Sequence, residues 1–181
     1  MPASNSEISE IETGVGSVSL TPVSSLVTRF FSAKEYVLER SIWVRHPVKD
    51  VFPFFAAAEN LERITPPELG FRIRTSLPIE MRRGALIDYA IRLHGIPMKW
   101  RTEITSWDPP HSFEDTQLSG PYKKWVHTHR FTENAGGTVI EDRVAYALPF
   151  GFLGRIVHPL VARQLKRIFD YRETVLSKLF A

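Results

Sequence analysis

The sequence predicts an α+β domain in which a curved antiparallel sheet of about seven strands wraps around one long helix. Three observations support this fold class. Apolar and polar residues alternate along one segment near residue 40 and along six consecutive segments between residues 69 and 148. Two short helical patterns lie between the first strand and the other six. A helical pattern with a long apolar stripe occupies residues 154–180.

The first 33 residues differ in composition from the rest of the chain. They are rich in serine, threonine and small residues and show little periodicity. Such segments bury too little apolar surface to order themselves. We therefore predict a flexible tail over residues 1–33 and one domain over residues 34–181.

The domain is predicted to start with a strand and two short helices. Tyr36–Val44 alternates, and its more apolar face is the expected core face, although that face includes Arg40. Pro47 suits the first turn of the helix that follows, and Pro53 costs little if it falls within the same turn. Residues 60–64 form a second helical pattern, which a Pro-Pro pair ends.

Six further strands are expected where the hydrophobic period changes to two. Clusters of Gly, Pro, Asn and Asp separate them, and the short turns imply an antiparallel meander. The predicted strands are residues 69–76, 84–95, 97–107, 111–119, 123–133 and 137–148.

The last predicted helix, residues 154–180, presents one apolar stripe to the sheet. Arg172 falls on the buried side near Phe169. Because a buried arginine needs a counter-charge, we expect it to pair with a carboxylate. The members of the stripe are Ile156, Leu160, Val161, Leu165, Ile168, Phe169, Val175, Leu176 and Leu179.

Polar, titratable residues lie on the strand faces that should be apolar. Residues two apart share a face, so Trp125, His127 and His129 point the same way. The pattern repeats one strand earlier and one strand later. Burying such groups unpaired is costly, so they either satisfy one another or face a ligand. The residues that we predict to line a ligand cavity are Tyr89, Trp100, Asp115, Gln117, Trp125, His127, His129, Asp142 and Tyr146.

The pair His127 and His129 leaves three interpretations open. Imidazoles titrate near neutrality, so the pair could act as general acid and base. With neighbouring Asp, Gln and Tyr it could instead form a satisfied buried network or orient a ligand, which is the interpretation that we favour. With Asp142 or Asp115 as a third ligand it could bind a metal ion. His-x-His alone is a weak signal, and we predict no metal and no other cofactor.

The bulk composition excludes several classes of site. The chain has no cysteine, which excludes disulfides, thiol nucleophiles and thiolate metal sites. Its 23 basic residues are nearly balanced by 20 acidic ones, so we predict no nucleic-acid partner. Neither a GxGxxG nor a P-loop pattern occurs.

The sequence also predicts where in the cell the protein is found. The first residues include Glu7, Glu10 and Glu12 without an apolar core segment, so no signal peptide is expected. No apolar run approaches the roughly 20 residues of a spanning helix, and we predict a cytoplasmic protein. Basic residues on the last helix allow at most a weak contact with a membrane surface. They are Arg155, Arg163, Lys166, Arg167 and Lys178.

Three local motifs resemble a bacterial subgroup of one superfamily. They are Gly120-Pro121-Tyr122 with Trp125–Phe131, Gly137-Thr138 with Asp142, Tyr146 and Pro149, and Ile168–Arg172. Together with the order of elements, they are similar to the helix-grip fold of START-related (SRPBCC) proteins, in particular polyketide cyclase/dehydrase-like proteins. The resemblance implies a cavity between the sheet and the last helix for a lipid-, polyketide- or isoprenoid-like molecule. It also implies that cyclisation or dehydration is possible in such a cavity.

Three functions follow as hypotheses. The first is binding of a hydrophobic or amphipathic small molecule. The second is a cyclase- or dehydratase-like enzyme that uses His127 or His129 as acid or base. The third is an interaction module whose partner contacts the basic helix face or the tail.

Overall fold

The structure, a computed structural model, describes residues 8–10, 34–93 and 95–181. It confirms the predicted order of a strand, short helical segments, six strands and one long helix, and it adds a three-residue strand at the start and a third short helical segment. The strands are β1 (Ile8–Glu10), β2 (Glu35–Val44), β3 (Arg72–Ile73), β4 (Leu86–Leu93), β5 (Ile96–Asp108), β6 (Ser112–Ser119), β7 (Lys124–Asn134) and β8 (Gly137–Ala147). The helices are α2 (Val48–Ala56), the short 3-10 helices η1 (Ala58–Glu62) and η2 (Pro67–Leu69), and α3 (Phe152–Leu179).

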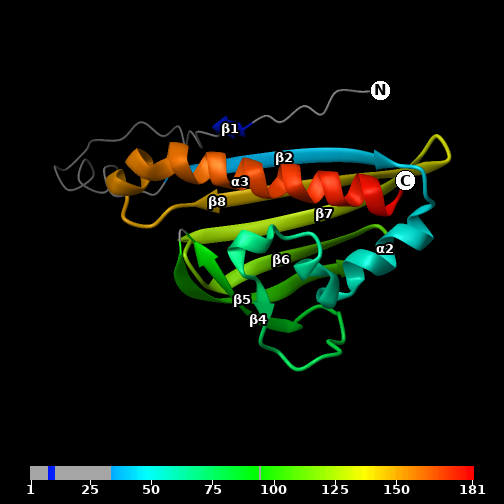
Figure 1. The fold of residues 1–181 in the computed structure, drawn as a ribbon, viewed down its shortest axis with the longest axis horizontal. Coiled ribbons are helices and arrows are strands. Elements are labelled where there is room, and N and C mark those ends of the chain that lie inside the picture. The colour runs from blue at the N-terminus through cyan, green and yellow to red at the C-terminus, as the bar shows by residue number, and fades with distance from the viewer. Residues whose placement is uncertain (1–7, 11–33, 94) are drawn as a thin grey trace, which may run out of the picture.

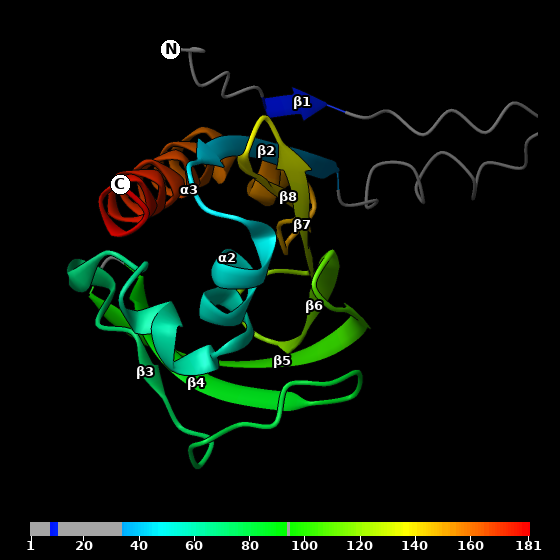
Figure 2. The same ribbon diagram turned by 90° about the vertical axis from the view of Figure 1, so that its right-hand side faces the viewer.

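The strands of the described residues form one antiparallel sheet in the order β1-β2-β8-β7-β6-β5-β4-β3. It contains the predicted meander from β3 to β8, to which β2 adds by pairing with β8. Figure 1 shows α3 running alongside β2 and β8. Figure 2 shows how strongly the sheet curves, with α2 inside the curve and α3 at one side. This is the helix-grip arrangement.

Three residues of the predicted tail belong to the sheet. Ile8–Glu10 pairs with β2 and forms the edge strand β1. The remaining residues of the tail, 1–7 and 11–33, lie outside the described residues. The division of the chain into a tail and a domain therefore stays a prediction.

The alternation of the strands buries the predicted face. In β7, Trp125, His127 and His129 are buried, and the residues between them are exposed or half-buried. In β2, the Arg40 side chain is only 8% exposed, and its Nη2 lies 2.7 Å from Oδ1 of Asp170 in α3. A cation on the core face of β2 is thus neutralised by the helix that covers it.

Two details of the helices differ from the simplest expectation. Helix α2 begins after Pro47, so Pro53 lies in its second turn and not in its first. In α3, Ile156 and Leu160 are 59% and 53% exposed, although their spacing assigns them to the buried stripe. The first turns of α3 extend past the ends of β2 and β8 (Figure 1), so the sheet covers the stripe only farther along the helix.

Two large apolar clusters fill the space inside the curve. One joins the sheet to α3 and includes Tyr36, Val144 and Phe169. The other lies beneath α2 and includes Phe52 and Phe131. The polar residues of β6, β7 and β8 lie between these two apolar regions, which sets them in an environment of low polarity.

Candidate functional site

A cavity of about 170 Å³ lies between the sheet, the segment of α2 and η1, and α3. An engineered apolar cavity of about 150 Å³ in another protein binds benzene. The present cavity therefore accommodates a compact molecule of about one ring.

Aromatic side chains of the sheet form one wall of the cavity. Trp100 of β5 stacks on Tyr89 of β4 with ring centroids 5.5 Å apart. It meets Trp125 of β7 edge to face at 5.3 Å. The indole Nε1 of Trp100 donates a hydrogen bond of 3.1 Å to Thr102 Oγ1, so its polar atom is satisfied within the wall. These contacts fix the rings and leave their apolar surfaces for a ligand.

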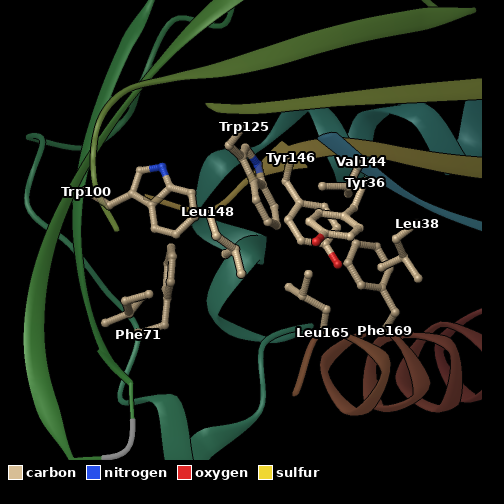
Figure 3. Packing of buried hydrophobic residues seen from close by; sticks show 11 residues of the cluster. Tyr36, Leu38, Phe71, Trp100, Trp125, Val144, Tyr146, Leu148, Leu165 and Phe169 are labelled. Atoms are coloured by element: carbon tan, nitrogen blue, oxygen red, sulfur yellow. The ribbon is translucent and has the colours of Figure 1, made fainter. Parts of the chain in front are cut away.

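Helix α3 forms the opposite wall. Leu165 and Phe169 line the cavity from the helix. Figure 3 shows them on the far side of the cluster from Phe71 and Trp100. Because sheet and helix each contribute apolar side chains, a bound molecule would lose contact with water on both faces.

One end of the cavity is polar and is formed by Asp115 of β6 with His127 and His129 of β7. Asp115 and His127 are register partners across the two strands, and His129 follows His127 on the same face. The imidazole centroids lie 3.8 Å apart. His129 also stacks on Phe113 at 4.1 Å. Strand register alone therefore brings these three side chains together.

Asp142 of β8 lies behind the two imidazoles, on the side away from Asp115. Its Oδ1 is 3.0 Å from His127 Nε2 and 2.8 Å from His129 Nδ1. The same oxygen is 3.1 Å from Nη2 of Arg172 in α3. Asp142 and its three partners are all buried. The negative charge of Asp142 is therefore stabilised by these partners and not by water.

Burial and neighbouring charges shift the pKa of two of these groups. Burial lowers the pKa of His127, because it disfavours the imidazolium form, and His129 adds to this effect while Asp142 opposes it. Burial alone would raise the pKa of Asp142. The Arg172 charge and the hydrogen bonds of the two histidines outweigh it and hold the pKa of that carboxyl well below its usual range. Asp142 is therefore ionised and His127 neutral at pH 7.

The structure separates the predicted site residues into two groups. Those that line the cavity are Tyr89, Trp100, Asp115, Trp125, His127 and His129. Asp142 instead lies behind the imidazoles. The Tyr146 hydroxyl lies 3.0 Å from His158 Nε2 of α3. The Gln117 amide donates to the Tyr122 carbonyl at 2.7 Å. The last two side chains satisfy partners within the fold and do not line the cavity.

Comparison with known proteins identifies the family. Residues 36–179 match the model of the family described as polyketide cyclase / dehydrase and lipid transport. The chain belongs to this family. The match extends from the start of β2 to the end of α3, and so covers the whole cavity. No curated protein matches the chain in sequence.

Solved structures share the fold of this polyketide cyclase/dehydrase family member. Ms6760 from Mycobacterium smegmatis is 20% identical, with a TM-score of 0.59 over 79% of this chain and 89% of that one. Major latex-like protein 151 from Panax ginseng is 10% identical, with a TM-score of 0.57 over 81% and 97%. A nucleoside-diphosphate sugar epimerase from Corynebacterium glutamicum is 27% identical, with a TM-score of 0.57 over 78% of this chain but only 28% of that one.

Several cavity residues of this family member are absent from the predicted set. Thr102 lies two residues from Trp100 on the same strand face, so the period of two could have identified it. Arg172 lines the cavity as well as pairing with Asp142. Phe55 and Leu61 line it from α2 and η1, where apolar spacing indicates only a core face and does not distinguish a cavity wall from packed interior.

The basic face of α3 is partly neutralised within the fold. Arg167 lies 2.8 Å from Glu68, and Lys166 lies 2.9 Å from Asp170. Among the described residues, none of the helices combines the length and the apolarity that crossing a membrane requires. The cytoplasmic location and the weak contact with a membrane surface stay predictions.

Proposed function

We propose that the protein binds a hydrophobic or amphipathic small molecule in the cavity between the sheet and α3. The observation that carries this proposal is the combination of apolar walls with one polar end, which is how ligand sites gain affinity and fix orientation. Membership of a family described by polyketide cyclisation, dehydration and lipid transport supports it.

The size of the cavity limits the ligand. A volume of about 170 Å³ favours a compact, ring-bearing molecule over an extended acyl chain. Tyr89, Trp100 and Trp125 line the cavity and offer aromatic surface against which a planar ring can pack. The polar substituent of such a ligand would meet Asp115, His127 and His129.

Native mass spectrometry of gently purified protein tests this proposal. We expect an adduct that is lost on denaturation and whose mass identifies the ligand. Titration with the apolar dye 8-anilinonaphthalene-1-sulfonate (ANS) gives a second readout on protein freed of its adduct. Ile91→Phe places extra volume at a buried cavity position and should weaken dye binding at least about tenfold. Ile79→Phe, at a half-buried position outside the cavity, is the matched control.

The proposal also makes a claim about His127. His127→Ala should weaken ligand binding while the protein stays folded. If that variant unfolds, the imidazole is required by the buried network and not by a ligand. If wild-type protein shows neither an adduct nor saturable dye binding that responds to Ile91→Phe, the cavity is not a ligand site.

A second candidate function is a cyclase- or dehydratase-like reaction. The observation that favours it is a neutral imidazole, His127, at the polar end of an apolar cavity beside Asp115, which suits a general base. Native mass spectra distinguish the two functions. In a dehydratase, His127→Asn should retain a ligand heavier by one water than the wild-type adduct. Equal adduct masses in the two proteins would favour binding without reaction.

A further inference from the structure

Two imidazoles lie between two carboxylates at the polar end of the cavity. His127 and His129 each direct one ring nitrogen toward Asp142 and the other toward Asp115. The Asp142 side is buried against Arg172. The Asp115 side faces the cavity. The two sides differ in their distances, and this difference assigns the proton of His127.

On the Asp142 side the distances require hydrogen bonds. Oxygen Oδ1 lies 3.0 Å from His127 Nε2 and 2.8 Å from His129 Nδ1. Two acceptors would repel at such a separation, so His127 Nε2 carries a hydrogen and donates it to the carboxylate. His129 Nδ1 lies between this oxygen and Arg172 Nη2, which donates toward it at 3.3 Å. An imidazole in its neutral form has one N–H. His127 Nδ1 therefore presents a lone pair to the cavity, and His129 Nε2 lies on the same side of the two rings.

On the cavity side three atoms that can bind a metal converge. Asp115 Oδ2 lies 3.6 Å from His127 Nδ1 and 3.4 Å from His129 Nε2. The first separation is too long for a hydrogen bond, and the second is that of a long one. The three ligand atoms all lie within 4.8 Å of one another, the arrangement that suits a shared cation.

We propose that Asp115, His127 and His129 bind a divalent transition-metal ion, with zinc as the best fit. Two atoms that are each about 2.1 Å from zinc at a tetrahedral angle are about 3.4 Å apart, close to the separations of the carboxylate oxygen from the two nitrogens. Two histidines with one carboxylate, and a further coordination position toward a cavity, form a donor set typical of catalytic zinc and non-haem iron sites.

The surroundings of the three ligands support the assignment. Histidines that bind metals usually donate their other N–H to a carboxylate, which fixes ring and tautomer. Asp142 accepts this hydrogen bond from His127, and the same oxygen lies 2.8 Å from His129 Nδ1. Phe113 stacks on His129 and limits its rotation. The charge of Arg172 is compensated by Asp142, so Asp115 provides the net negative charge that faces the cation.

The metal would contribute to the binding of the cavity ligand. Its fourth position faces the apolar cavity, where a hydroxyl or carbonyl oxygen of the ligand would complete the coordination. This last step rests on the proposed ligand binding. The metal site itself does not, because all of its donor atoms belong to the chain.

Titration of tag-free, full-length protein with Co²⁺ after treatment with a chelator tests the site. We expect one equivalent to bind, with visible absorption bands of four-coordinate cobalt, and Zn²⁺ to displace it. Asp115→Asn and His127→Gln should each lower the affinity at least about tenfold. His111→Gln, an exposed histidine outside the cluster, is the matched control and should bind as wild type does.

Asp115→Asn decides the test if His127→Gln fails to fold, because Asp115 takes no part in the pair of Asp142 with Arg172. Absence of cobalt binding would overturn the metal site and leave the cluster as a hydrogen-bond network. Binding that Asp115→Asn leaves unchanged would place the metal elsewhere and would overturn it too. An organic adduct on metal-free protein that binds no cobalt would overturn the metal site and still support ligand binding.

Discussion

Arg172 in α3 and Asp142 in β8 form a buried ion pair, with Nη2 and Oδ1 3.1 Å apart. The pair fastens the last helix to the last strand. Asp142 Oδ1 also accepts from His127 Nε2 and lies 2.8 Å from His129 Nδ1, so the arginine holds the carboxylate that orients both imidazoles. Fold stability and the geometry of the polar end of the cavity therefore depend on the same contact.

Replacing Arg172 with Met should destabilise the protein strongly. Methionine keeps most of the apolar volume but leaves Asp142 without its counter-charge in a buried site. Removal of one partner of a buried pair typically costs about 3–5 kcal/mol. Urea unfolding followed by circular dichroism measures the change in the free energy of unfolding.

Arg167→Met is the matched control for this variant. Arg167 lies on the same helix and pairs with Glu68, but its side chain is 72% exposed. Exposed pairs contribute at most about 1 kcal/mol. If Arg172→Met also costs less than about 1 kcal/mol, the buried pair does not stabilise the fold.

Most of the fold could be predicted because its elements have clear hydrophobic periods. Alternation in β7 placed Trp125, His127 and His129 on the buried face, and the structure confirms it. The need of a buried arginine for a counter-charge predicted that Arg172 pairs with a carboxylate, which the structure also confirms. Both inferences need only local spacing and a simple electrostatic rule.

The rest could not be predicted because it depends on how elements meet. The spacing of Ile156 and Leu160 fits a buried stripe, but both side chains are exposed. The spacing along the helix does not reveal where the sheet that covers it ends. Likewise, His-x-His does not reveal that Asp115 and Asp142 lie on opposite sides of the two rings. That arrangement follows from strand register, and it is what turns a weak motif into a candidate metal site.

Gly137→Ala should destabilise the start of β8. A Cβ at this position would lie 2.3 Å from the Val44 carbonyl oxygen and 2.7 Å from the Trp43 ring. Since the first contact is with backbone, relief requires β2 and β8 to separate, and overpacking of this kind costs about 1–3 kcal/mol. Thermal or urea unfolding measures it. Ser41→Ala, at an exposed position of the same strand pair, should change stability by less than about 0.5 kcal/mol, and an equal effect in both variants would contradict the steric explanation.

Stability should fall on the alkaline side because of Tyr146. Burial raises the pKa of Tyr146 to about 12, with a contribution from Tyr36. An unfolded tyrosine loses its proton near pH 10, so between about pH 10 and 12 the unfolded state releases a proton that the folded state retains. The stabilisation is complete below pH 10 and is lost as the pH rises through this window.

Urea unfolding at several pH values measures this loss, and Tyr146→Phe tests its origin. The variant should lose less stability than wild type between pH 10 and 12. Some loss should remain, because burial also raises the pKa of Tyr89 and Tyr122. An identical loss in the variant and the wild type would show that another group is responsible.

Gln117→Ala should lower stability and leave ligand affinity unchanged. The Gln117 amide donates to the Tyr122 carbonyl at 2.7 Å, and the Tyr122 N–H lies 3.3 Å from Gln117 Oε1. Loss of both hydrogen bonds should cost about 1–2 kcal/mol in the free energy of unfolding. The affinity for ANS should not change, because the side chain does not line the cavity. A variant that keeps its stability but binds the dye tenfold more weakly would return Gln117 to the ligand site that the sequence predicts for it.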